Sequence, residues 1–219
     1  MIKVGILIPT RGDRKVFLDN ALRMISQQTV TPAVIEVVDD PPVSSKVDLA
    51  WRYRLGYDRL CKKGVDIIHF WEDDDWYHRR FLEVMIKAWH DLGRPNMVGL
   101  KSTVYYHLKL RKWARWDEMK RACAFHTLLI PGLNLNVCPD YAIDFDRKVW
   151  YANGGITFEP PFPICMGIKH GDGMTAGFGH RKTWTLYKKN SDPDMRYFDS
   201  VVTDIESQNF YKSIAKQLR

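Results

Sequence analysis

The segment Val65-Asp66-Ile67-Ile68-His69-Phe70-Trp71-Glu72-Asp73-Asp74-Asp75 decides how the rest of the sequence is interpreted. It begins as a mostly apolar run of the length typical of a buried strand, and four adjacent acids end it. Apolar residues then recur at helical spacing, at Phe81, Met85, Ala88, Trp89 and Leu92. The pattern predicts a strand, an acidic loop and a helix in immediate succession.

Two segments nearer the amino terminus show the same order. An apolar run that ends at Pro9, and another that ends before Asp39, each lead through a polar loop into a segment with helical spacing. Three such units predict an α/β protein with a doubly wound, mostly parallel sheet. Ligands of such sheets lie beyond the carboxyl ends of the strands, so we expect Thr10, Asp39 and Asp73 to meet at one crevice.

Length and composition limit the number of domains and the class of protein. The 219 residues, 45% of them hydrophobic, suffice for one large α/β domain and are too few for two ordinary ones. The sequence has no apolar run of about 18 residues and no signal-peptide pattern, which predicts no membrane span and a cytoplasmic protein, or one in the host cytoplasm if a phage encodes it. Four cysteines without metal-ligand spacing predict free thiols.

The four acids after the predicted strand suggest a cation site. Like charges in such proximity disfavour the ionised state, and a bound cation removes that penalty. Oxygen ligands suit Mg²⁺ or Mn²⁺, which can also hold two phosphates and stabilise a departing diphosphate. The alternative is a solvated acidic turn that caps the following helix.

The loops of this sequence resemble those of the GT-A glycosyltransferases, particularly the family-2 type, over roughly residues 3–170. The matching segments are Ile8-Pro9-Thr10-Arg11, Val38-Asp39-Asp40 and Phe70-Trp71-Glu72-Asp73-Asp74-Asp75, which looks like the DxD element. The segment after Asp40 departs from the pattern, because it reads Pro-Pro-Val-Ser-Ser where the family usually has Gly-Ser. The resemblance implies a GT-A (Rossmann-like) fold in a single domain, residues 1–219, with a less regular acceptor-side portion.

The resemblance also implies a hexosyl- or pentosyltransferase whose donor site lies at these loops. A nucleotide-diphosphate sugar, with a UDP-sugar favoured, is the expected donor, and Mn²⁺ or Mg²⁺ is the expected cofactor. Residues 1 to about 100 would bind the donor, and residues from about 101 to 219 the acceptor. Asp73 and Asp75 are the implied metal ligands. The implied donor-binding residues in these loops are Pro9, Thr10, Arg11, Asp39, Asp40, Asp73 and Asp74.

The segment Ile143-Asp144-Phe145-Asp146 opens a predicted helix that ends at Gly154-Gly155. It is similar to the Glu-Asp-x-Asp segment that carries the catalytic base in the resembled family, although Ile143 stands where that family prefers Glu. Asp144 falls on the base position, and Asp146 and Asp140 remain alternatives. Such a base would remove the acceptor's proton in an inverting single displacement. Asp144 could instead serve only as a helix cap.

The segment Lys169-His170-Gly171-Asp172-Gly173 lies where GT-A enzymes often place a late metal ligand. His170 is the first candidate for that role and His180 the second, and either histidine could be an ordinary loop residue. The nearby cations Lys169, Arg181 and Lys182 could neutralise a diphosphate or remain solvated.

The acceptor is left open by the residues from 101 to 121, where seven Lys or Arg side chains alternate with aromatic ones. With a net charge of +7, this pattern suits either a saccharide acceptor or a hydroxylated base in DNA, as in phage-type DNA modification. Trp113 and Trp116 could alternatively be core residues.

Two other functions are weighed. A nucleotidyltransferase would normally need a glycine-rich phosphate loop after the first strand, which Thr10-Arg11-Gly12-Asp13-Arg14 does not resemble. A non-catalytic nucleic-acid-binding module would have little use for intact metal-binding acids. The sequence does not indicate an oligomeric state.

Overall fold

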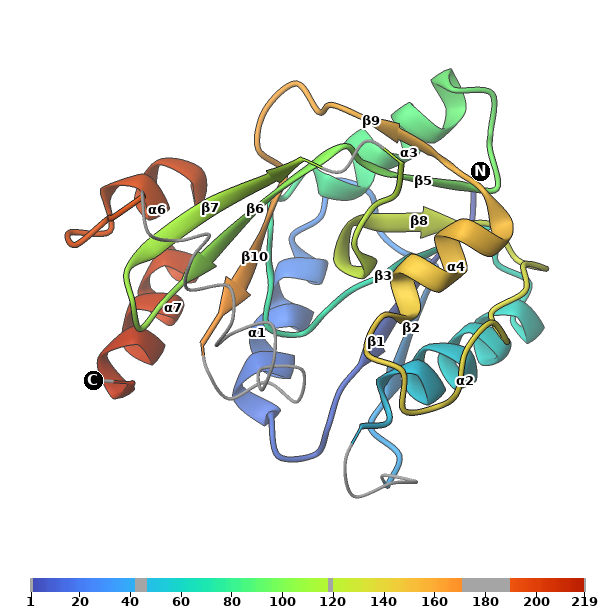
Figure 1. Cartoon of the computed structure of the whole chain (residues 1–219), viewed down its shortest axis with the longest axis horizontal. Helices are drawn as coiled ribbons and strands as arrows, with labels where there is room; N and C mark the ends of the chain where they lie inside the picture. The colour runs from blue at the N-terminus through green and yellow to red at the C-terminus, as the bar shows by residue number, and fades with distance from the viewer. Residues whose placement is uncertain (1, 42–46, 118–119, 171–189, 219) are drawn as a thin grey trace.

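The computed structural model describes residues 2–41, 47–117, 120–170 and 190–218, in which a six-stranded sheet lies beside a four-stranded one (Figure 1). The helices are α1 (Lys15–Ser26), α2 (Leu49–Lys62), α3 (Phe81–Asp91), η1 (Ala124–His126, a 3-10 turn), α4 (Phe145–Asn153), α6 (Arg196–Val201) and α7 (Ile205–Gln217). The strands are β1 (Val4–Pro9), β2 (Val34–Val38), β3 (Ile67–Phe70), β4 (Trp76–Tyr77), β5 (Met97–Leu100), β6 (Ser102–His107), β7 (Lys112–Asp117), β8 (Thr127–Leu129), β9 (Ile156–Phe158) and β10 (Cys165–Lys169).

The larger sheet has the strand order β2-β1-β3-β8-β5-β9. Every neighbouring pair is parallel except those of β8, which runs antiparallel to both β3 and β5. The predicted mostly parallel sheet is therefore confirmed. Because β2, β1 and β3 are adjacent and parallel, the polar loops that follow them leave the same edge of the sheet.

The central strand β1 is buried on both faces, which explains its uninterrupted apolar sequence. Successive side chains of a strand point to opposite faces. Ile6 and Ile8 join a core cluster with residues of α1 and α3, whereas Leu7 joins another with residues of α2 and α4. On the second face, Gly56 of α2 approaches so closely that a Cβ there would lie 2.7 Å from atoms of Leu7 and Val38. Helices thus cover both faces and hold the sheet edge in place.

The smaller sheet, with the order β4-β10-β6-β7, was not anticipated from the sequence. β6 and β7 form an antiparallel hairpin, and β10 pairs in parallel with β6 and antiparallel with β4. Of the four strands of this sheet, β4 alone lies next to the acids in sequence, so the sheet assembles from distant segments. Because β10 pairs within this sheet, Lys169 and His170, at the end of β10, lie beside the acidic loop that follows β3.

The carboxyl-terminal segment forms two helices, α6 and α7. The helical hydrogen-bonding pattern stops after Val201, and Asp204 begins α7 by accepting a hydrogen bond from the amide of Ser207 (2.8 Å). α7 packs beside α1 through Arg23, which contacts Glu206 at 2.8 Å (Figure 1). Across the described segments, no helix combines the length and apolar character needed to cross a bilayer.

Candidate functional site

The loops after β1 and β3 are joined directly at the edge of the larger sheet. The Thr10 hydroxyl donates to Asp73 Oδ2 at 2.5 Å, and the Thr10 amide donates to Val38 O, at the end of β2, at 3.1 Å. Both Thr10 and Asp73 are buried. The structure thus brings together residues that lie 63 positions apart in the sequence.

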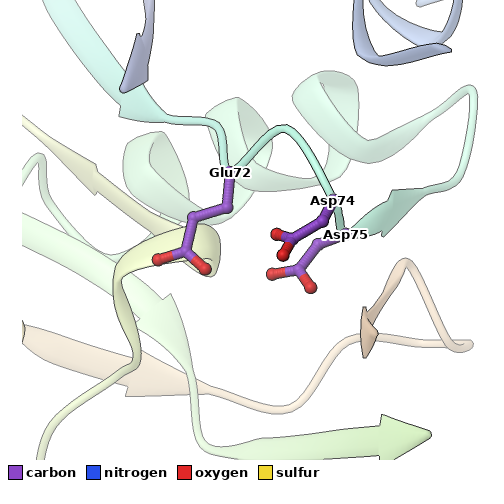
Figure 2. Close-up of side chains that lie close together, drawn as sticks. All are labelled: Glu72, Asp74 and Asp75. Atoms are coloured by element: carbon purple, nitrogen blue, oxygen red, sulfur yellow. The ribbon is translucent and has the colours of Figure 1, made fainter. Parts of the chain in front are cut away.

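Three carboxylates of the acidic loop lie close to one another: those of Glu72, Asp74 and Asp75 (Figure 2). Each offers one oxygen within 4.8 Å of the others. Asp75 Oδ1 accepts a hydrogen bond from the amide of Ile168 (2.7 Å), but Asp75 Oδ2 is buried and has no hydrogen-bond partner among the described residues. An unsatisfied buried carboxylate oxygen facing two other acids fits a hard divalent cation.

This group differs from the predicted metal pair of Asp73 and Asp75. Asp73 lies outside it, because its carboxylate is turned toward Thr10 and toward Arg14, whose Nη2 lies 3.1 Å away. Glu72 belongs to the group; it is one of the four acids predicted to form a cation site, although only Asp73 and Asp75 of these were named as metal ligands. Its place in the same acidic run was a signal, although which of four adjacent side chains face one another depends on the turn that the loop adopts.

The acids of this loop have strongly perturbed protonation equilibria. Burial, together with the charges of Asp74 and Glu72, raises the pKa of Asp75 well above its usual value. Burial and the neighbouring Asp74 raise the pKa of Asp73 to about 7. For Asp74 burial acts in the same direction, but Arg14 and His170 outweigh it and lower the pKa. Full ionisation of these acids is therefore disfavoured unless a further cation is present.

His170, the first candidate for a late metal ligand, lies at this loop. Its Nε2 is 3.0 Å from Asp74 Oδ2, and its ring stacks on Phe17 of α1 with the centroids 4.7 Å apart. His180 and Arg181 lie outside the described residues, so the structure does not place them. Arg14 was not predicted from the sequence, although it stands in the same polar loop as Arg11. Arg11 itself points to Asp13, with 4.0 Å between Nη2 and Oδ2.

The predicted nucleoside-binding residues lie on the β1 and β2 side of this edge. Pro9 is the last residue of β1 and is buried, and Asp39 is exposed directly after β2. Asp40 is turned toward α2, where both of its oxygens contact Arg59, at 2.8 and 2.9 Å. The structure therefore leaves Asp39, rather than Asp40, open to solvent.

A small cavity of about 140 Å³ adjoins the acidic loop. Polar groups from three separate segments face it, namely Glu72, Asp146 and Lys169. Its remaining lining residues, mostly aromatic or apolar, are Leu49, Tyr53, Tyr105, Cys123, Ala124, Phe125, Ile143 and Phe145. Such walls around a few polar groups are typical of a ligand site.

Of the three acids proposed as a base, Asp146 is the one that lines this cavity. It pairs with Arg121, with 3.1 Å between Nη1 and Oδ2. Asp144, at the first position before α4, pairs with Arg147, and its carboxylate accepts no hydrogen bond from the helix backbone; Asp140 pairs with Arg54. The geometry favours Asp146 over Asp144 and Asp140 for contact with a ligand in the cavity.

Within the basic and aromatic stretch from 101 to 121, residues 102–117 form the β6–β7 hairpin, which divides into packed and exposed parts. Tyr106 is buried, and Trp113 stacks on Tyr197 with 3.8 Å between the ring centroids. Trp116 keeps 39% of its surface exposed, and Arg115 pairs with acidic neighbours. The expectation that both tryptophans could be core residues is thus wrong for Trp116.

Comparisons with known proteins point to the fold and not to a family. Neither the known protein families nor the curated proteins include a match to this sequence. Among solved structures, TarS 1-349 of S. aureus in complex with UDP-GlcNAc superimposes with a TM-score of 0.54 at 12% identity, covering 99% of this chain and 80% of that chain. The same protein in complex with UDP matches with a TM-score of 0.50 at 12% identity, covering 76% and 60% of the two chains.

A third match, A197 from STIV, has a TM-score of 0.48 at 15% identity over 73% of this chain and 81% of that chain, too loose a likeness to add to the argument. The chain spans 37% of a longer TarS chain, so it corresponds to part of that protein. The strand order, the helices on both faces and the TarS superposition together identify a GT-A-like α/β fold.

Proposed function

We propose that this protein transfers a sugar from a nucleotide-diphosphate sugar, with a UDP-sugar favoured, to a hydroxyl group of an acceptor. The observation that carries the proposal is Asp75, whose carboxylate lies close to two further acids and whose buried Oδ2 has no hydrogen-bond partner in the described part of the chain. The similar TarS structures in complex with UDP and UDP-GlcNAc support a nucleotide-sugar donor. Residues 1–219 would act as one catalytic unit, with the donor half up to about residue 100.

Glu72, Asp74 and Asp75 would hold the Mn²⁺ or Mg²⁺ ion, with His170 beside Asp74. When bound, the ion would neutralise the negative charge that develops on the departing diphosphate. Asp73, predicted as a ligand, would instead hold Thr10 in position. Pro9, Thr10, Arg11 and Asp39 would face the nucleoside, while Lys169 and Arg181 would approach the diphosphate.

Asp146 would act as the catalytic base, in preference to Asp144. It would take the proton from the acceptor hydroxyl as the oxygen forms a bond to the anomeric carbon. The bond from that carbon to the diphosphate oxygen would break in the same step, so the nucleoside diphosphate leaves and the configuration inverts. Arg121 would keep the Asp146 carboxylate oriented toward the cavity. The acceptor would be a saccharide or other small molecule, or a hydroxylated base in DNA.

The test is to incubate the protein with a panel of nucleotide sugars and to measure the release of nucleoside diphosphate, with Mn²⁺ and with EDTA. We expect release from one donor, dependent on the metal. Addition of hydroxymethylated DNA or of a saccharide panel then identifies the acceptor through faster release. A protein that binds neither Mn²⁺ nor any nucleotide sugar would contradict the proposal.

A further inference from the structure

Arg14 lies within the acidic loop, although it belongs to the segment between β1 and α1. Its Nη2 is 2.6 Å from Asp74 Oδ2 and 3.1 Å from Asp73 Oδ1. Its side chain is only 20% exposed, and its Nε is buried without a hydrogen-bond partner among the described residues. One guanidinium therefore bridges two of the four acids and keeps a further donor unused.

In this arrangement the guanidinium of Arg14 contacts a carboxylate that a metal ion would need as a ligand. Asp74 is one of the three acids close enough to share an ion, yet its Oδ2 already contacts both Arg14 and His170. A divalent ion and a guanidinium that share one carboxylate repel each other at close range, since little water screens them in a buried site. Arg14 and the ion therefore compete for Asp74.

The groups around Arg14 would allow its guanidinium to turn toward a second partner. Its guanidinium carbon lies 5.3 Å from the centroid of the Phe17 ring. This cation–π contact would persist if the planar guanidinium rotated over the ring. A guanidinium also matches phosphate oxygens with two parallel hydrogen bonds, and the free Nε is one of the required donors. A diphosphate at the acidic loop would offer Arg14 such a partner.

We infer that Arg14 is a replaceable counter-ion of this site, which holds Asp73 and Asp74 in the free protein and turns to the donor's diphosphate when a metal ion takes Asp74. The inference rests on the proposed function and adds to it a coupling between metal and donor. Without donor, Arg14 opposes metal binding. With donor, the released guanidinium strengthens diphosphate binding, so the two ligands bind cooperatively.

The test compares the unchanged protein with Arg14→Met by isothermal titration. We expect Mn²⁺ alone to bind Arg14→Met about tenfold more tightly, and UDP in the presence of Mn²⁺ to bind it about tenfold more weakly. The control is Arg23→Met, which removes a guanidinium from the α1–α7 contact and should leave both affinities unchanged. Arg14→Lys, which keeps one charge without the bridging geometry, should give intermediate values.

Thermal unfolding separates a replaceable counter-ion from a fixed structural ion pair. In EDTA, Arg14→Met should melt below the unchanged protein because Asp73 and Asp74 lose their cation. Mn²⁺ should then raise the melting temperature of Arg14→Met by more than it raises that of the unchanged protein. For Arg23→Met the Mn²⁺ increment should equal that of the unchanged protein.

Equal or weaker Mn²⁺ binding by Arg14→Met, or unchanged UDP binding, would overturn the inference while leaving the proposed function in place. Failure of the unchanged protein to bind either Mn²⁺ or UDP would overturn the proposed function and the inference with it. The two failures are therefore distinguished by the unchanged protein alone.

Discussion

Two buried aspartates, Asp75 and Asp192, have very different surroundings in this molecule. Asp192, just before α6, accepts hydrogen bonds at 3.0 Å from the Tyr106 hydroxyl and from the amides of residues 197 and 198. In the described part of the chain, Asp75, at the end of the acidic loop, accepts one hydrogen bond, from Ile168, and its buried Oδ2 has no partner. Asp192 ties the β6–β7 hairpin to the carboxyl-terminal helices, whereas Asp75 faces Glu72 and Asp74.

The difference separates a carboxylate that stabilises the fold from one that is available to a ligand. Buried polar atoms are nearly always hydrogen-bonded in folded proteins, so an exception requires an explanation. For Asp75 the explanation offered by its neighbours is a cation. Substitutions at the two positions should therefore have opposite consequences for stability and for ligand binding.

The largest effect is expected for Asp75→Asn. The amide cannot supply the negative charge at Oδ2, so we expect donor-sugar turnover to fall by about 10³-fold. In EDTA, however, the variant should be at least as stable as the unchanged protein. Because the pKa of Asp75 is raised, this side chain contributes to stability while it is protonated, and the contribution is lost as the pH rises through that pKa.

These effects are measured by nucleoside diphosphate release with Mn²⁺ and by urea unfolding with EDTA at pH 7. Asp19→Asn, on the exposed face of α1, is the control and should change neither quantity. If Asp75→Asn showed normal turnover, Asp75 would not differ from Asp192 in its importance for the reaction, and the distinction between the two residues would fail.

Asp192→Ala should show the reverse pattern. It leaves buried donors at Tyr106 and Phe198 without their acceptor, so we expect the free energy of unfolding to fall by about 3 kcal/mol. Mn²⁺ affinity, measured by titration on the folded variant, should be unchanged. A loss of metal binding as large as that of Asp75→Asn would show that the two aspartates do not serve separate purposes.

Asp146→Asn extends the comparison to the cavity. We expect the transfer rate to fall by about 10²-fold with little change in donor affinity, because the amide cannot accept the acceptor's proton. Asp144→Asn, whose side chain pairs with Arg147, should retain most of the transfer rate. Single-turnover transfer and UDP titration measure the two quantities, and a reversed order of the variants would move the base to Asp144.

The smallest effect concerns two buried histidines that are not part of the acidic site. Burial lowers the pKa of His69 and of His126 to about 3, so both are neutral in the folded protein. Their contribution to stability is complete above the ordinary histidine pKa near 6.5 and is lost as the pH falls from there toward 3. Both nitrogens of His126 have contacts, whereas His69 Nε2 has no hydrogen-bond partner within the segments that the structure describes.

Replacing His69 with Phe should therefore reduce the loss of unfolding free energy between pH 6 and 4 by about 1.4 kcal/mol per pH unit, the contribution of one proton. Urea unfolding at several pH values measures this slope. His90→Phe, at an exposed site at the end of α3, is the control and should leave the slope unchanged. An unaltered slope in His69→Phe would show that another group binds the proton.

The donor half of the fold follows from local features of the sequence. The runs that end at Pro9 and before Glu72 are mostly apolar and buried on both faces, and such strands are typical of the interior of a sheet covered by helices. The smaller sheet could not be predicted in the same way. Its strand β4 has two residues, and β10 is recognisable only through pairing with β6 and β4, partners distant in sequence.

The position of the site and the kinds of residue in it were determined by the sequence itself, because parallel strands bring their carboxyl ends to one edge and four adjacent acids end one of them. Which acids face one another was decided only by the tertiary structure. Asp73 turns to Thr10 and Arg14, and Asp75 meets the amide of Ile168, all contacts across long distances in sequence.

The orientation of the proposed base was likewise decided only by the tertiary structure. Asp144 and Asp146 are two positions apart at the start of a helix, where about 100° of rotation per residue points them in nearly opposite directions. Phe145, between them, stacks on Tyr53 with parallel rings and thereby fixes how α4 is rotated. That contact between distant segments, and no local preference, turns Asp146 toward the cavity.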